Sequence, residues 1–165
     1  MVWDFADVDR FSAGALGEPG QRVFYLQAVA GTEVATVRLE KTQVGALAEY
    51  LAQLLNDLPA PDVESVPGEV GLIEPVQEAW LVGQIGVDYD KARDRMMVRA
   101  DELQVEEDEE STGGTMRVAL TRGQVQAFVV HATVLVSAGR PPCPLCGRPI
   151  DPEGHMCIKT NGHKH

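Results

Sequence analysis

The stretch VRLEKTQVGALAEYLAQLL, residues 37–55, decides the fold, because it joins the end of a strand to an amphipathic helix and has a counterpart later in the chain. The counterpart is VALTRGQVQAFVVHATVLV, residues 118–136, and the two align without a gap at an offset of 81 residues. Seven of the first eleven aligned positions match or differ by a close substitution. Similarity at a long fixed period is typical of duplicated supersecondary units. The sequence therefore predicts an internal repeat, with a chance resemblance between two strand-to-helix junctions as the alternative.

The first unit, at about residues 20–58, is predicted to be a β-hairpin followed by a helix. Residues 22–39 contain two β-rich runs separated by Ala30-Gly31-Thr32, a turn suited to a hairpin. From Val44 onward apolar residues recur at spacings of three and four, as in an amphipathic helix: Leu47, Ala48, Leu51, Leu54, Leu55 and Leu58. Pro59 ends this helix, and the proline-rich residues 59–78 are predicted to be a long surface connection.

The second unit, at about residues 79–138, is predicted to add three strands and a helix. Residues 79–105 predict two strands around a turn at 88–90, and TMRVAL, residues 115–120, predicts the third. Between them EEDEESTGG, residues 106–114, is typical of a solvated acidic loop, with a cation site as the alternative. The spacing of Thr121 and Gln124 predicts a capping box, and Gly139 predicts the end of the helix.

The middle of this last helix, FVVHATVLV at residues 128–136, is so rich in β-branched residues that composition alone also allows a strand. The alignment with the first unit favours a helix. A helix that is apolar on most sides has to be covered on most sides, by the sheet and by either the C-terminal tail or a second subunit. His131 is interpreted as a hydrogen-bonded core or interface residue rather than a catalytic one.

These patterns predict an α+β fold in two parts. Residues 1–138 form a duplicated body, in which two related β-hairpin-plus-helix units give an antiparallel sheet with two main helices. Residues 139–165 form a C-terminal zinc-knuckle tail. The chain has enough apolar residues, 44%, to bury the core of one ordinary domain without help from disulfides.

The tail carries the most specific chemical pattern, CPLCGRPIDPEGHMC at residues 143–157, which holds all three cysteines. Cys143 and Cys146 form a C-x2-C pair, and His155 and Cys157 follow after a short return loop. Two thiolates at this spacing, with Gly147 to close the turn, are typical of a zinc knuckle. Four ligands complete a Cys3His tetrahedron, which leaves no position for substrate and so predicts a structural Zn²⁺ rather than a catalytic one. A thiol redox role for the cysteine pair is the disfavoured alternative.

The fourth ligand stays open, because His163 could replace His155 or Cys157. With three firm ligands, water could take the fourth place and a hydrolytic role would become possible.

Charge narrows the range of partners. The net charge of −11 disfavours binding to a nucleic-acid backbone or to an anionic membrane, since both kinds of binding depend on clustered basic residues. The near absence of aromatic residues in the tail further disfavours nucleic-acid binding there. The first residues lack the basic and apolar pattern of a secretory signal, and no stretch is apolar enough to span a bilayer, so we expect a cytoplasmic protein.

Three segments carry a resemblance to a known family: GEPGQRVFYLQA at 17–28, LEKTQVGALAE at 39–49 and GRPPCPLCGRPIDPEGHMCIKTNGH at 139–163. They resemble the uncharacterised actinobacterial family catalogued as domain of unknown function 3090, over nearly the whole chain. The resemblance implies a cytoplasmic protein from a high-GC Gram-positive source, with genes for a histidine-phosphatase-like and a kinase-like protein nearby. In that pattern His163 is less fixed than the other candidate ligands, which favours Cys143, Cys146, His155 and Cys157. The family implies no activity.

Two functions remain in competition. The leading hypothesis is a non-enzymatic binding or adaptor protein with a protein partner of unknown identity, whose zinc tail holds the C-terminus against the body. The alternative is a metal-dependent hydrolase acting on a phosphorylated or nucleotide substrate, with Arg22 as an anion contact. An arginine that opens a strand is more often a surface or ion-pair residue. The catalytic residues of such a hydrolase are unknown, and no phosphate loop, nucleophile elbow or dinucleotide fingerprint occurs in the sequence.

Overall fold

The computed structural model describes residues 2–18, 20–59, 68–104 and 113–137. Strands and helices follow the chain in this order: β1 (Val2–Phe5), β2 (Arg10–Leu16), β3 (Val23–Ala30), β4 (Glu33–Leu39), α1 (Lys41–Asp57), β5 (Val82–Asp90), β6 (Arg95–Glu102), β7 (Thr115–Leu120) and α2 (Arg122–Ser137). The predicted hairpin at Gly31, the strand at 115–120 and both helices are confirmed. The fold is α+β, as the sequence predicted.

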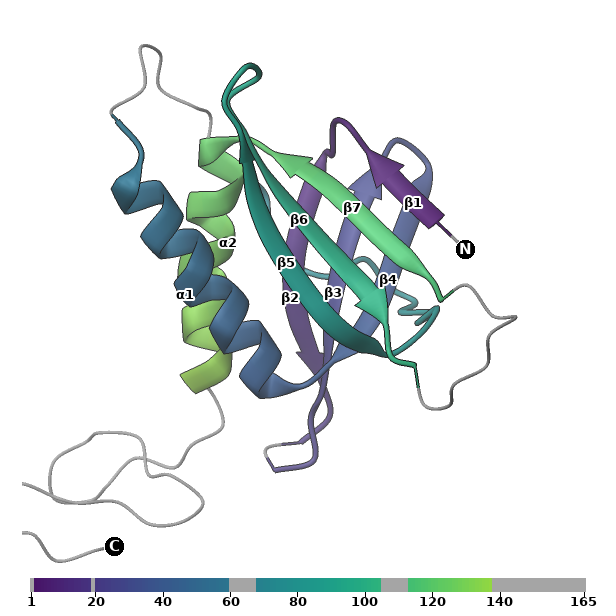
Figure 1. The fold of residues 1–165 in the computed structure, drawn as a ribbon. Helices are drawn as coiled ribbons and strands as arrows, with labels where there is room; N and C mark the ends of the chain where they lie inside the picture. The colour runs from purple at the N-terminus through teal and green to yellow at the C-terminus, as the bar shows by residue number, and fades with distance from the viewer. Residues whose placement is uncertain (1, 19, 60–67, 105–112, 138–165) are drawn as a thin grey trace, which may run out of the picture.

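The strands form two sheets rather than one. One sheet has the order β1-β7-β6-β5 and the other has the order β2-β3-β4 (Figure 1). All pairs are antiparallel except β1 with β7, which is parallel. The prediction of a single antiparallel sheet was therefore wrong. The strands β3 and β4 pair with β2, whereas β5, β6 and β7 form a sheet with β1, so the N-terminal segment contributes one strand to each sheet.

Neither N-terminal strand was predicted from the sequence. The strand β2, RFSAGAL, carries small residues where β-branched ones would be expected, and β1 has only four residues. The small residues of β2 allow close packing, because Ala13 and Gly14 are both buried within the sheet. A Cβ atom on Gly14 would clash with the side chain of Leu72, so the glycine makes room for that leucine.

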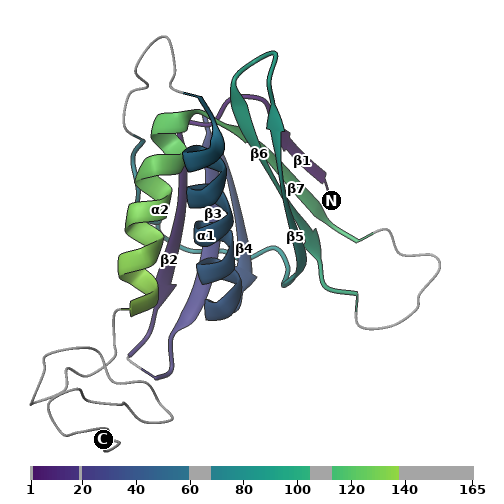
Figure 2. The same cartoon turned by 60° about the vertical axis from the view of Figure 1, so that its left-hand side comes forward.

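Both helices lie side by side on one flank of the sheets, as the second view shows (Figure 2). The predicted capping box of α2 is confirmed: the Gln124 N–H donates to Thr121 Oγ1 at 3.1 Å, and the Thr121 N–H donates to Gln124 Oε1 at 3.0 Å. At the equivalent position of α1, the Glu40 N–H donates to Gln43 Oε1 at 2.7 Å. Each cap fixes where its strand stops and its helix begins.

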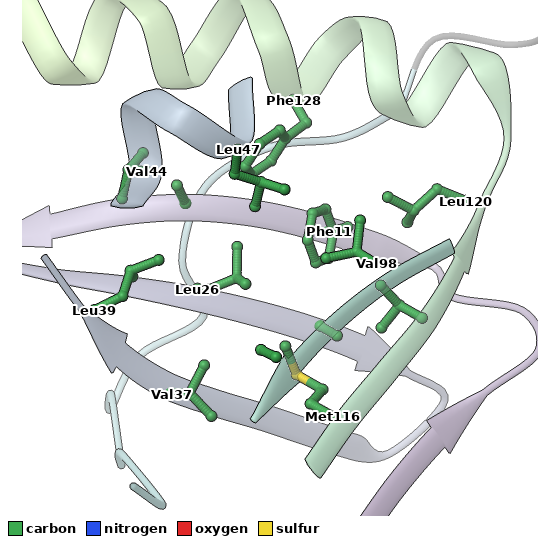
Figure 3. Packing of buried hydrophobic residues seen from close by; sticks show 14 of the residues in the cluster. Phe11, Leu26, Val37, Leu39, Val44, Leu47, Val98, Met116, Leu120 and Phe128 are labelled. Atoms are coloured by element: carbon green, nitrogen blue, oxygen red, sulfur yellow. The ribbon is translucent and has the colours of Figure 1, made fainter. Parts of the chain in front are cut away.

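The core lies between the two sheets and the helices (Figure 3). Phe11 from β2 and Phe128 from α2 meet there with ring centroids 4.9 Å apart. Several apolar positions paired in the sequence alignment are buried alike, as in Val37 with Val118 and Leu47 with Phe128. This agreement is what an internal repeat would produce, and the duplication itself stays a prediction.

The hairpin between β5 and β6 turns later than the sequence predicted. Asp88, Tyr89 and Asp90 belong to β5, and the turn is formed by residues 91–94. Asp88, Tyr89 and Asp90 continue the alternation of a strand, because the two aspartates point to the solvent face while Tyr89 packs against the core. The aspartates were therefore mistaken for turn residues. Asp94 makes the turn possible, since it adopts a positive φ of 53°, a region that Asp and Asn tolerate better than most residues.

One side of α2 is left exposed by the described residues, and its cover by the C-terminal tail or a second subunit stays a prediction, because both lie outside these residues. Val130 and Val134 are each 63% exposed, and with Val70 and Ala127 they line a shallow concave surface along the helix. His131 is hydrogen-bonded as expected, because its Nε2 lies 3.1 Å from the Ala13 carbonyl oxygen, and the residue is half-buried.

Residues 71–73 lie over the outer face of the β2-β3-β4 sheet, which agrees with the predicted surface connection. The Gly71 N–H donates to Ser12 Oγ at 2.8 Å. Gln27, buried in β3, accepts from the Ile73 N–H at 2.7 Å and donates to the Ile73 carbonyl at 3.2 Å. These bonds give the polar groups of the outer face partners, which is what burial of a glutamine requires.

Candidate functional site

The strand β5 forms an open edge of the four-stranded sheet. It pairs with β6 on one side, and beyond Val82 no strand of the described residues pairs with its other side. In an antiparallel pair, alternate residues send their N–H and C=O groups to the partner strand. The Tyr89 N–H donates to Asp88 Oδ1 at 2.8 Å and not to β6. The Glu102 N–H donates to the Gly114 carbonyl, in the direction of β7. Because the direction alternates along the ladder, the backbone N–H and C=O groups of Ile85 and Val87 lie on the side of β5 away from β6.

A groove runs between this edge and α1, which lies beside β5 (Figure 1). Its volume is about 490 Å³. The helix contributes Gln43, Ala46, Leu47 and Tyr50, and the strand contributes residues 83–87. Tyr50 is 67% exposed, so a large aromatic side chain stands in solvent at the groove's mouth. The groove thus combines an apolar wall with a backbone edge.

The end of the groove near the start of β5 is closed by polar contacts. Gln43, which caps α1, also donates from Nε2 to the Val82 carbonyl at 3.3 Å. The Leu103 N–H donates to the Leu81 carbonyl at 2.7 Å, and a bulge follows at Gly83. A side chain at Gly83 would collide with the backbone of Leu103, so the bulge requires glycine.

Gly86 has no comparable structural explanation. A Cβ atom there would meet no heavy atom within 4 Å, and its φ lies outside the left-handed region. Glycine inside a strand weakens it, and one of its uses is to let another backbone or a ligand approach closely. The groove supplies a place for such an approach.

The opposite end of β5 is held by a cluster of Tyr89, Asp94 and Arg122. The Tyr89 hydroxyl donates to Asp94 Oδ1 at 2.7 Å, and Arg122 Nε donates to both Asp94 oxygens at 3.0 and 3.1 Å. Arg122 Nη1 also donates to the Pro59 carbonyl at 2.7 Å. The cluster joins the β5–β6 turn to the start of α2 and the end of α1.

These contacts shift the acid–base behaviour of the cluster. The hydrogen bond from Tyr89, with the bonds and charge of Arg122, holds the pKa of Asp94 below its ordinary value, although partial burial opposes the shift. The same hydrogen bond raises the pKa of the Tyr89 phenol, and partial burial adds to this. Asp94 therefore stays ionised as the anchor of the hairpin.

The residues predicted to bind metal, Cys143, Cys146, His155, Cys157 and the alternative ligand His163, lie outside the described residues. Within residues 2–18, 20–59, 68–104 and 113–137, His, Cys, Asp and Glu form no group of three or more that could hold a metal ion. Arg22, the predicted anion contact, is half-buried directly before β3. No helix of the described part is long and apolar enough to span a membrane.

The groove was missed by reasoning from the sequence, although one signal was present. Gly83 and Gly86 interrupt the β5 sequence VGQIGVDYD at a point where a strand would favour β-branched residues. Tyr50 gave no signal, because one exposed aromatic residue on an amphipathic helix is common.

The described residues therefore define an α+β protein with two sheets, two helices and a groove along an open strand edge. Residues 3–157 match the family described as "Protein of unknown function (DUF3090)", and the chain belongs to this family. Searches among curated proteins and among solved structures gave no match.

Proposed function

We propose that this protein is a non-enzymatic binding module that adds an extended segment of a partner protein to the edge of β5. The observation that supports this function most directly is the groove itself, where the backbone groups of Ile85 and Val87 face an apolar wall on α1. Strand addition to an open edge is a recurring mode of peptide recognition, in which main-chain bonds hold the peptide and pockets select its side chains.

A favourable binding free energy requires both the open edge of β5 and the apolar wall on α1. A peptide paired with Ile85 and Val87 would gain up to about four ladder bonds, each contributing about 0.5–1.5 kcal/mol net. Ordering the peptide costs about 1–2 kcal/mol per residue, so the hydrogen bonds alone would at most offset this cost. Burial of one valine-sized side chain against Leu47 and Tyr50 would add about 1.5–3 kcal/mol. The apolar wall therefore decides whether a short peptide gains anything by pairing with this edge.

The proposal retains a structural Cys3His zinc site in the C-terminal tail, formed by Cys143, Cys146, His155 and Cys157. Its support is the spacing of the four residues in the sequence and the completeness of the tetrahedral ligand set. In this function the metal would stabilise the tail of an adaptor and would take no part in a reaction.

Replacement of Val87 by proline tests the open edge. Peptides would be selected against the full-length protein from a displayed library and measured by fluorescence anisotropy. Val87→Pro removes an N–H that points away from β6, and proline is tolerated in an edge strand where its missing N–H would face solvent. We expect it to weaken binding about tenfold or more, whereas the matched variant Val87→Ala keeps the N–H and stays within about threefold.

Two further measurements complete this test. Methylation of alternate backbone amides in the peptide should abolish binding, because it removes ladder donors without changing the protein. Tyr50→Ala should weaken binding about fivefold or more, while Gln53→Ala, one turn along α1 and outside the groove, should not. Full affinity in Val87→Pro, or a library that yields no peptide competing for this groove, would contradict the proposed function.

A further inference from the structure

We propose that the β5 edge selects strands in which apolar and basic side chains alternate, and that Asp88 determines the preference for the basic ones. This inference rests on the proposed function and states which segments the groove would accept. It follows from the two faces that β5 presents along its open edge.

The inner face of an added strand has to be apolar. A strand paired with β5 continues its pleat, so its side chains alternate between the same two faces. On the inner face Ile85 and Val87 are half-buried and pack against the core. Peptide side chains on that face would enter the groove beside Leu47 and Tyr50. A charged side chain there would lose solvation without a partner among the lining residues.

The outer face of the same edge carries a carboxylate that has no ion-pair partner among the described residues. Gln84, Gly86 and Asp88 are exposed on this face. Among the described residues, no basic side chain lies within ion-pair distance of Asp88, whose Oδ1 accepts only a backbone N–H. The arginines of the neighbouring turn and strand have other contacts: Arg93 lies 3.9 Å from Asp90, Arg95 donates to backbone carbonyls, and Arg99 donates to Asp101 at 3.0 Å.

Two features favour a basic side chain as the partner of Asp88. Directly opposed side chains of opposite charge stabilise neighbouring strands. The net charge of −11 adds a longer-range attraction for a basic segment. The open space at Gly86, where a Cβ would meet no heavy atom within 4 Å, leaves room for the long aliphatic stem of lysine or arginine.

Two matched peptides test the inference on the full-length protein. The repeats Lys-Val-Lys-Val-Lys and Glu-Val-Glu-Val-Glu share apolar positions and length and differ in charge. We expect the lysine peptide to bind about tenfold more tightly at low salt, and the difference to shrink as salt screens the charges. Asp88→Asn keeps an oxygen for the Tyr89 N–H and should remove most of the preference, and Asp88→Lys should reverse it.

The outcomes separate this inference from the proposed function. Equal binding of both peptides, abolished by Val87→Pro, would overturn the inference and leave the function standing. Binding of neither peptide, together with a library that yields no ligand, would overturn the function. A preference for lysine that persists unchanged in Asp88→Asn would remove Asp88 as its cause. A dimer in solution that Val87→Pro dissociates would show that the edge pairs with a second copy, and would overturn both.

Discussion

Truncation of Phe128 to alanine should destabilise the protein strongly, whereas the same change at Val130 should have almost no effect. Phe128 is fully buried and packs against Phe11, whereas Val130, two residues later on α2, is 63% exposed. Phe→Ala in a core costs about 3–5 kcal/mol, because the transfer free energy is lost and a cavity remains. That is a large part of the total of about 5–15 kcal/mol for a typical domain, so Phe128→Ala should still fold at 25 °C but with a small margin.

The control variant, Val130→Ala, should change the free energy of unfolding very little. Val130→Ala loses a side chain that is mostly in solvent, and alanine has a higher helix propensity by a few tenths of a kcal/mol. We expect a net change within about 0.5 kcal/mol. Thermal unfolding followed by far-UV circular dichroism should show a fall of roughly 6–20 °C for Phe128→Ala and less than about 2 °C for Val130→Ala. If Phe128→Ala does not fold, Phe128→Leu should lose about 1 kcal/mol.

This pair of variants also tests the type of secondary structure. In a strand residues 128 and 130 would share a face, whereas in a helix they lie about 200° apart. Equal destabilisation by the two variants would therefore refute the helix and with it the placement of α2 against β2.

Three further predictions concern other parts of the chain. Asp94 has a folded-state pKa below its ordinary value of 3.8, so the stability that Asp94→Asn lacks should be fully present above pH 3.8 and should shrink as the pH falls through the lower folded-state value. Urea unfolding of both proteins at a series of pH values from neutral into acid measures this, and a difference that stays constant down to the most acidic pH at which both still fold would refute it. Gly14→Val should destabilise by about 1–3 kcal/mol through its clash with Leu72, and by clearly less in a Leu72→Ala background; equal losses in thermal unfolding would contradict the contact. Cys143→Ser should release zinc and lower the melting temperature; full zinc content by mass spectrometry, with an unchanged melting temperature, would disprove the structural metal site.

The parts of the fold that the sequence predicted are those with strong periodicity and local hydrogen bonding. The helix at 41–57 follows from the spacing of its leucines, and the cap at Thr121 and Gln124 follows from side chains three residues apart. These features depend on near neighbours in the chain, so a local pattern is enough to find them. The strand β2 depends on distant partners, since Gly14 is needed only because Leu72 lies across it.

The candidate groove is harder to predict for the same reason. Its two walls, α1 and β5, are separated by the connection at 59–78, and only the tertiary fold brings Tyr50 near Gly86. The sequence led instead to the cysteine block, which is chemically specific but local. A local motif can indicate a metal site without indicating where a partner would bind.

The open edge of β5 is protected at its two ends and not in its middle, which agrees with the proposed function. Exposed edges invite uncontrolled pairing, and proteins usually blunt them with charges, bulges or short strands. In β5 the protection is confined to the two ends: a bulge at Gly83 and a bond from Gln43 at the start, and the Asp88 carboxylate over the Tyr89 N–H near the turn. Between them only Ile85 and Val87 offer backbone groups, beside an apolar wall that ends in an exposed tyrosine. An edge restricted to so short a window disfavours extended sheet growth while leaving room for one short strand, which is the geometry that a peptide-binding module requires.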